Sequence, residues 1–268
     1  MKKQIICINW GPKYGADYVN RLYGMVARNL TPPFRFTCFT DSTAGLRSEV
    51  DAQPLPPLDV EMPTGTFGIW PKARLWGDQL SDLSGPVLFF DLDLVIVGSL
   101  NPFFEFGNPQ DVILARNPAV PFERLGQTSL FRFPVGHLKP LQDVFRADPQ
   151  GIADKYRYEQ RLVSRQCPGG FRFWPRSWVK TFKQHCQRPL PFNYFMEPRL
   201  PRRSRVVIFP GRVSPHHVAQ GAWGDESKHL SVSDHILRTF AGAPEIRPLR
   251  HLRHYFIPPK WLKEHWRE

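Results

Sequence analysis

One segment limits the folds open to this chain more than any other. Residues 86–97 read PVLFFDLDLVIV, the most apolar stretch in the sequence, and only Asp91 and Asp93 interrupt it. A run of this composition is typical of a central strand that is buried on both faces, together with the segment just beyond it. The chain is therefore expected to build a sheet around this strand.

The segments around this strand alternate between two kinds of pattern. Strands are expected at residues 4–9, 34–40, 111–116, 129–133 and 205–209, and helices at 16–30, 72–83, 138–146, 158–165 and 178–186, with a Pro-rich irregular connection at 51–66. Interleaved strands and helices predict an α/β fold. The opening strand-helix-strand is typical of sheets that bind nucleotides at the carboxyl ends of their strands, and Asn9 and Asp41 fall at such ends.

The pattern weakens from about residue 211 onward, where Pro, His, Arg and Trp dominate. We therefore expect one catalytic domain over residues 1–215 and a basic, aromatic extension over 216–268. Residues 247–268 carry six Lys and Arg against two Glu, with interleaved aromatics at Tyr255, Phe256, Trp261 and Trp266. This composition suits an anionic membrane interface. The alternative is that these aromatics pack back on the domain.

The net charge of +12 is compatible with nucleic acid, an anionic membrane or a phosphate-bearing substrate as partner. The sequence has no zinc-finger, RRM, KH or helix-turn-helix signature, so no nucleic-acid partner is expected. It has no signal-peptide pattern and no run of 18 or more apolar residues. A cytoplasmic location is therefore expected, with the inner face of the membrane as a candidate surface. Four scattered cysteines are expected to be reduced core thiols: Cys7, Cys38, Cys167 and Cys186.

Two carboxylates inside an apolar segment require an explanation, because an unpaired buried charge costs several kcal/mol. In an extended chain, residues two apart point to the same side, so Asp91 and Asp93 can converge on one cation. Carboxylate oxygens suit Mg²⁺ or Mn²⁺, which keep open positions for substrate phosphates and water. The alternative is that one aspartate caps a turn while the other pairs with an Arg or Lys.

Segments 72–76 (KARLW) and 87–103 (VLFFDLDLVIVGSLNPF) resemble the donor-binding core of glycosyltransferase family 8. Other pieces follow in a similar order: Asn9 and Tyr14 near the start, Thr40-Asp41 at a strand end, YEQ at 158–160, and VVIFPG at 206–211. The resemblance extends over residues 3–217. The aspartate pair with its upstream lysine is the most specific part.

This resemblance implies a GT-A fold, that is, a Rossmann-like nucleotide-binding mixed sheet flanked by helices. It also implies transfer of a hexose from a UDP-sugar, with Mn²⁺ or Mg²⁺ and with retention of anomeric configuration, to a glycan or lipid-linked acceptor. The implied donor-binding residues are Asn9, Tyr14, Asp41, Lys72, Asp91 and Gly211. Glu159 and Gln160 are implied to face the sugar as the catalytic residues, and Asp91 and Asp93 to bind the metal. The alternatives to these roles are that Lys72 is a solvated helix lysine, that Tyr14 is an ordinary loop aromatic, and that Glu159 pairs with Arg157 or Arg161 on the surface.

The chain departs from the family pattern at two places. The metal-binding His that usually stands three residues before the late glycine is Ile208 here, and the following Lys-Pro becomes Ser214-Pro215. The nearest imidazoles are His216 and His217, which makes His216 the candidate third metal ligand, with solvation as the alternative. The second departure is QTS at residues 127–129, where relatives often have Asn-Ser at the sugar site. This departure leaves the sugar specificity open.

Two other function classes remain open on the sequence. A sugar nucleotidyltransferase would also need an aspartate-held metal, but it would usually carry a Gly-rich phosphate loop, and WGPKYG at residues 10–15 is a poor match. A catalytically degenerate relative or a basic binding protein is the non-enzymatic alternative. UDP binding without sugar turnover would indicate the degenerate relative, and salt-sensitive RNA or DNA binding would indicate the basic binding protein.

Overall fold

The computed structural model describes residues 2–224, 229–241 and 247–268. The chain forms two compact units, Met1–Leu92 with Ser99–Arg176, and Asp93–Gly98 with Ser177–Glu268. The expected boundary at residues 215 and 216 falls inside the second unit, and the division into a catalytic domain and an extension stays a prediction.

The first unit is built on a seven-stranded mixed sheet in the order β3-β2-β1-β4-β7-β6-β8. The strands are β1 (Gln4–Asn9), β2 (Arg35–Thr40), β3 (Asp51–Pro54), β4 (Pro86–Phe90), β6 (Ile113–Arg116), β7 (Gly126–Pro134) and β8 (Arg172–Phe173). Strands β3, β2, β1 and β4 are parallel, and β7 runs antiparallel to both β4 and β6. The first part of the apolar run forms β4 in the middle of this sheet, and residues 94–96 of the run form a strand of the second unit. The predicted α/β mixed sheet is confirmed.

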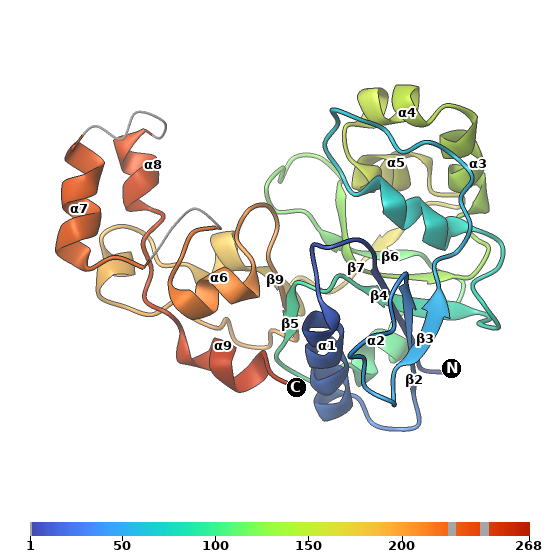
Figure 1. The fold of residues 1–268 in the computed structure, drawn as a ribbon, viewed down its shortest axis with the longest axis horizontal. Helices are drawn as coiled ribbons and strands as arrows, with labels where there is room; N and C mark the ends of the chain where they lie inside the picture. The colour runs from blue at the N-terminus through green and yellow to red at the C-terminus, as the bar shows by residue number, and fades with distance from the viewer. Residues whose placement is uncertain (1, 225–228, 242–246) are drawn as a thin grey trace. The chain divides into compact units, whose positions relative to one another are not determined.

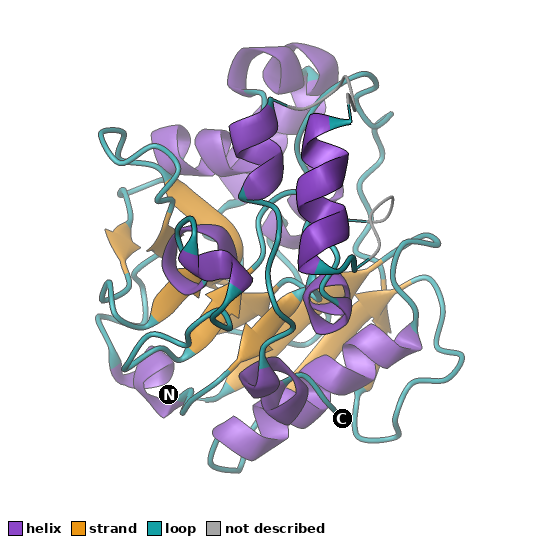
Figure 2. Ribbon diagram, turned by 90° about the vertical axis from the view of Figure 1, so that its left-hand side faces the viewer, coloured by secondary structure: helices purple, strands orange, loops and turns teal. Residues whose placement is uncertain are grey.

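Helices cover both faces of the sheet in the first unit (Figures 1 and 2). They are α1 (Ala16–Asn29), the 3-10 helix η1 (Trp70–Trp76), α2 (Asn101–Glu105), α3 (Lys139–Ala147), α4 (Pro149–Tyr156) and α5 (Glu159–Gln166). Helices α3, α4 and α5 pack against one another and, with η1, lie on one face, whereas α1 and α2 lie on the other (Figure 1). The helix expected at residues 16–30 is confirmed as α1.

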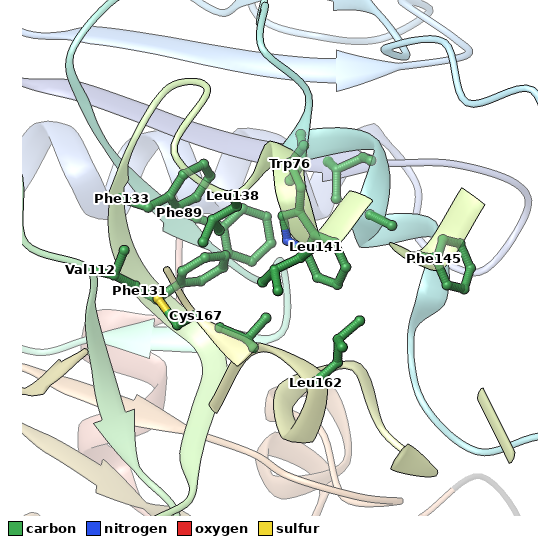
Figure 3. Close-up of a cluster of buried hydrophobic side chains, with 14 of the residues drawn as sticks. Trp76, Phe89, Val112, Phe131, Phe133, Leu138, Leu141, Phe145, Leu162 and Cys167 are labelled. Atoms are coloured by element: carbon green, nitrogen blue, oxygen red, sulfur yellow. The ribbon is translucent and has the colours of Figure 1, made fainter. Parts of the chain in front are cut away.

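An aromatic core joins the sheet to these helices (Figure 3). Phe131 of β7 contacts Phe89 of β4, with ring centroids 5.3 Å apart, and also stacks on Phe133. Trp70 of η1 stacks on Phe145 of α3 at 5.1 Å. Burying large aromatic side chains of this kind contributes a few kcal/mol each. This core holds η1 against the sheet and thereby fixes the position of the lysine that η1 carries.

The second unit contains a three-stranded sheet in the order β5-β10-β9. Its elements are β5 (Leu94–Ile96), β9 (Val179–Thr181), the π-helical turn η2 (Phe182–Cys186), η3 (Phe192–Tyr194), β10 (Val206–Ile208), α6 (Pro215–Gln220), α7 (Val232–Phe240), α8 (Pro248–Leu252) and α9 (Lys260–His265). Helices α7 and α8 lie side by side (Figure 1). Within the described residues, no helix is both long enough and apolar enough to cross a bilayer.

Three of the expected elements are wrong. The helix expected at residues 72–83 is only the 3-10 helix η1, because Gly77 and the left-handed backbone of Ser81 (φ 53°) end it. The connection at 51–66 begins with strand β3, whose edge position tolerates its proline. The helix expected at 178–186 begins as strand β9, because its residues pair with β10. The four cysteines are free and buried, as predicted.

Candidate functional site

The predicted polar residues of the first unit collect at one edge of its sheet. Strands β2, β1 and β4 are adjacent and parallel, so their carboxyl ends meet at the same edge. Asn9 pairs in register with Thr40, which precedes Asp41, and Asp91 directly follows β4. In open α/β sheets this is the edge that binds ligands. The first unit therefore presents two carboxylates and one amide where a nucleotide is expected.

Lys72 lies at this edge in an ion pair with Asp91. Its Nζ is 2.6 Å from Oδ1 of Asp91 and 4.0 Å from Oε1 of Glu159, and its side chain is only 4% exposed. The solvated alternative for Lys72 therefore does not hold. The pairing of one aspartate with a lysine, proposed above as an alternative to metal binding, does describe Asp91. No described residue donates a hydrogen bond to the second carboxylate oxygen of Asp91.

Glu159 is held in place from two sides. Its Oε2 accepts a hydrogen bond from the Ile69 backbone N–H at 2.9 Å, and its Oε1 accepts one from the Thr128 hydroxyl at 3.1 Å. The side chain is 7% exposed, so it does not lie on the surface to pair with a neighbouring arginine. A buried carboxylate with two donors is oriented with little freedom. Gln160 follows it in the first turn of α5 and is half-buried.

Gly68 allows the loop before η1 to approach Glu159 closely. A Cβ at this position would lie 3.1 Å from Oε2 of Glu159 and 3.1 Å from Cα of Tyr158, and the φ of +102° disfavours any other residue. Gly68 is not among the site residues predicted from the sequence. The only signal for it was its place between Pro-rich residues and a helix start.

The remaining donor-binding candidates of the first unit lie around the ends of β1 and β2. Asp41 accepts a hydrogen bond from the Gly11 backbone N–H at 2.8 Å, which ties the two loops together. The buried Oδ1 of Asn9 has no hydrogen-bond partner among the described residues, so it can accept a bond from a ligand. Tyr14 is half-buried in the loop after β1, with Lys13 over its ring at 4.6 Å.

The other predicted residues belong to the second unit. Asp93 directly precedes β5, and Gly211 follows β10 with a φ of +91°. Ile208 is buried in β10, opposite Leu94. Strands β5 and β10 are antiparallel, so Asp93 lies at the sheet edge where β10 ends.

The two histidines after Pro215 differ in their roles. His217 is buried and forms a reciprocal cap with Ser214, in which its Nδ1 accepts from the Ser214 N–H at 3.1 Å. His216 is exposed and contacts Gln220 one turn further along α6. Across the described parts of the chain, no group of three or more His, Cys, Asp or Glu is close enough to hold a metal ion.

Sequence comparisons find neither a family model nor a curated protein that matches this chain. Solved structures do match. The galactosyltransferase LgtC, in complex with donor and acceptor sugar analogs, superposes with a TM-score of 0.57 over 97% of this chain and 99% of its own, at 14% identity. The fold is that of the GT-A glycosyltransferases. The glycosyltransferase GlyE of Streptococcus pneumoniae TIGR4 matches with a TM-score of 0.54 at 10% identity, over 97% of this chain and 66% of its own.

A third glycosyltransferase structure agrees. The bifunctional WbbM apo structure has a TM-score of 0.54 at 12% identity, over 80% of this chain and 46% of its own. The predicted GT-A fold is therefore confirmed, while membership of family 8 remains a resemblance carried by the quoted motifs. Within this GT-A chain, Lys72, Asp91 and Glu159 form one contiguous cluster, although 87 residues separate the first from the last.

Proposed function

We propose that this chain is a nucleotide-sugar-dependent glycosyltransferase that transfers a hexose from a UDP-sugar to a glycan or lipid-linked acceptor, with retention of anomeric configuration. One observation carries the proposal. In a GT-A fold, Asn9, Asp41, Asp91, Lys72 and Glu159 converge at the carboxyl edge of the parallel strands, where this class of sheet binds nucleotides. The motif resemblance supports UDP as the nucleotide.

In this proposal, the donor lies along the strand ends. Asn9, with its unpartnered buried oxygen, accepts a hydrogen bond from the base or ribose, and Tyr14 lies against the uracil. Asp41 holds the loop that contains Gly11, and Gly211 gives the diphosphate access to backbone. Lys72 contacts the diphosphate and offsets its negative charge.

Asp91 and Asp93 are the proposed ligands of a Mn²⁺ or Mg²⁺ ion. The donor set fits such an ion, because Mg²⁺ is usually bound by one or two carboxylates together with substrate phosphates and water. His216 remains the proposed third protein ligand, and to bind the ion its side chain would have to leave Gln220 and approach the two aspartates. When bound, the ion would neutralise charge on the departing UDP. Lys72 pairs with one carboxylate oxygen of Asp91.

Glu159 and Gln160 are the proposed catalytic residues. As the bond between the sugar and the diphosphate breaks, positive charge develops on the sugar ring, and a fixed carboxylate beside it is stabilising. Ile69 and Thr128 hold Glu159 in one orientation, so little reorganisation is needed. Gln160 is the next residue along the chain and is half-buried, and its side-chain amide would orient the acceptor hydroxyl.

A substrate screen tests the proposal against the nucleotidyltransferase alternative. The chain is incubated with Mn²⁺ and either a panel of UDP-sugars or UTP with hexose 1-phosphates. A glycosyltransferase is expected to release UDP from at least one UDP-sugar, because water can replace the missing acceptor. Release of diphosphate from UTP would instead show a nucleotidyltransferase, and the proposal would then be wrong.

The proposed acceptor and the cytoplasmic location suggest an anionic membrane surface as a partner. Two of the tail aromatics, Tyr255 and Phe256, are buried, so they pack on the protein. Helix α7 is the better candidate, since it buries His235 and Thr239 and exposes Leu237 (66%) and Phe240 (73%). An apolar outer face beside basic residues is typical of interfacial helices.

A liposome assay checks this candidate. We expect Leu237→Ser with Phe240→Ser to weaken partitioning onto anionic vesicles by about 100-fold or more, since two apolar side chains worth about 1.5–3 kcal/mol each on burial are lost. The matched control is Val144→Ser on α3, which is 47% exposed and should bind like the native chain. Equal sedimentation of all three proteins would remove α7 as a membrane contact.

A further inference from the structure

A second charged site lies at one edge of the three-stranded sheet in the second unit. Strands β9 and β10 are parallel, so both end at this edge, and antiparallel β5 begins there. Lys183 lies in the turn after β9, Gly211 lies three residues after β10, and Asp93 precedes β5. The sheet topology therefore brings the cation Lys183 and the glycine Gly211 to the same edge as Asp93, a proposed metal ligand.

Lys183 is a half-buried cation beside an aromatic ring. In the parts of the chain that the structure describes, no carboxylate lies within ion-pair distance of its Nζ, which is 5.4 Å from the centroid of the Trp223 ring. Desolvation by burial lowers the pKa of Lys183, and the positive charge of Arg250 lowers it further. An ammonium in such surroundings is stabilised by an incoming anion.

Gly211 allows this ammonium to approach the main chain. A Cβ on Gly211 would lie 3.1 Å from Nζ of Lys183, closer than side chains normally pack, and the backbone φ of +91° also favours glycine. Trp223 in turn stacks on His254 at 4.1 Å, which fixes the ring beneath the lysine. The lysine is therefore held beside an open stretch of main chain.

We propose that Lys183, together with the main chain at Gly211, binds the phosphate groups of the nucleotide donor. This inference rests on the proposed function and adds a residue to it. The position at which the resembled motif has a lysine is Ser214 here, so that position brings no positive charge. Lys183 reaches the same glycine from a different element and supplies the missing charge. Lysine ammonium groups bind phosphate as point charges, which suits this geometry.

Calorimetric titration with inorganic diphosphate and with UDP tests this assignment. Diphosphate is titrated in the presence of EDTA, so that binding depends on protein cations alone, and UDP is titrated with Mn²⁺. We expect Lys183→Gln to weaken the binding of both ligands by about 10- to 100-fold, the loss expected for one hydrogen bond to a charged group. Lys183→Arg keeps the charge and should retain most of the affinity.

Lys180→Gln is the matched control, because Lys180 lies three residues earlier and its pKa is also lowered by burial. This variant should bind as the native chain does, and thermal unfolding should show that all variants are folded. Unchanged affinity in Lys183→Gln would overturn the assignment while leaving the proposed function intact. If the native chain binds diphosphate through Lys183 but does not bind UDP, the anion site stands and the proposed function fails. If the native chain binds neither diphosphate nor UDP, both the Lys183 assignment and the proposed function are overturned.

Discussion

Replacing Lys72 with methionine is expected to lower the free energy of unfolding by about 3 kcal/mol, the lower end of the range for breaking a buried ion pair. Methionine fills the space of the aliphatic chain, but the carboxylate of Asp91, 14% exposed, then loses its partner. Glu159 keeps its two hydrogen bonds from Ile69 and Thr128, so the loss arises mainly at Asp91. Urea denaturation at neutral pH measures the effect.

Two further variants show whether the effect comes from the buried pair. Adding Asp91→Asn to Lys72→Met removes the unpaired charge and should restore most of the lost stability, a coupling that a double-mutant cycle detects. Lys139→Met removes an exposed ion pair with Asp143 and should cost less than about 1 kcal/mol. If Lys72→Met costs no more than Lys139→Met, Lys72 is not the partner that stabilises Asp91.

Replacing Asp93 with asparagine is expected to lower the release of UDP from a UDP-sugar by about 100-fold or more. The change removes one of two proposed metal ligands, and loss of a single interaction that stabilises developing charge typically costs that much in turnover. The control is Asp59→Asn, which changes the net charge by the same amount at an exposed position in the first unit. It should leave turnover unaffected. Full activity of Asp93→Asn would exclude a metal role for this residue.

Local patterns in the sequence were sufficient to predict the centre of the fold. The first part of the apolar run at 86–97 is the middle strand β4, and the strand-helix-strand start is β1, α1 and β2 with nearly the expected ends. In each case burial and periodicity of neighbouring residues determine the structure. The helix predicted at residues 72–83 failed for a local reason, because Gly77 and the left-handed backbone of Ser81 end η1. The helix predicted at residues 178–186 failed because a contact distant in sequence decides there: pairing with β10 makes its first part a strand.

The candidate site could be predicted only in part. The sequence placed Asp91 after a buried strand and marked Lys72 and Glu159 by resemblance, but it gave no sign that the three side chains would meet. Their contact depends on packing of η1 and α5, which are distant in sequence. Lys183 was missed, because its relation to Gly211 arises from the order of strands in the small sheet. No sequence motif predicts that these two residues lie side by side.

The proposed function requires that this chain bind a uridine nucleotide through a metal held by Asp91 and Asp93. Calorimetric titration of UDP, with Mn²⁺ and then with EDTA, on the native chain and on Asp93→Asn tests it most directly. We expect UDP binding that is strengthened by Mn²⁺, and we expect this dependence on the metal to be lost in the variant. Absence of UDP binding to the native chain with either Mn²⁺ or Mg²⁺, or binding that neither EDTA nor the substitution affects, would contradict it.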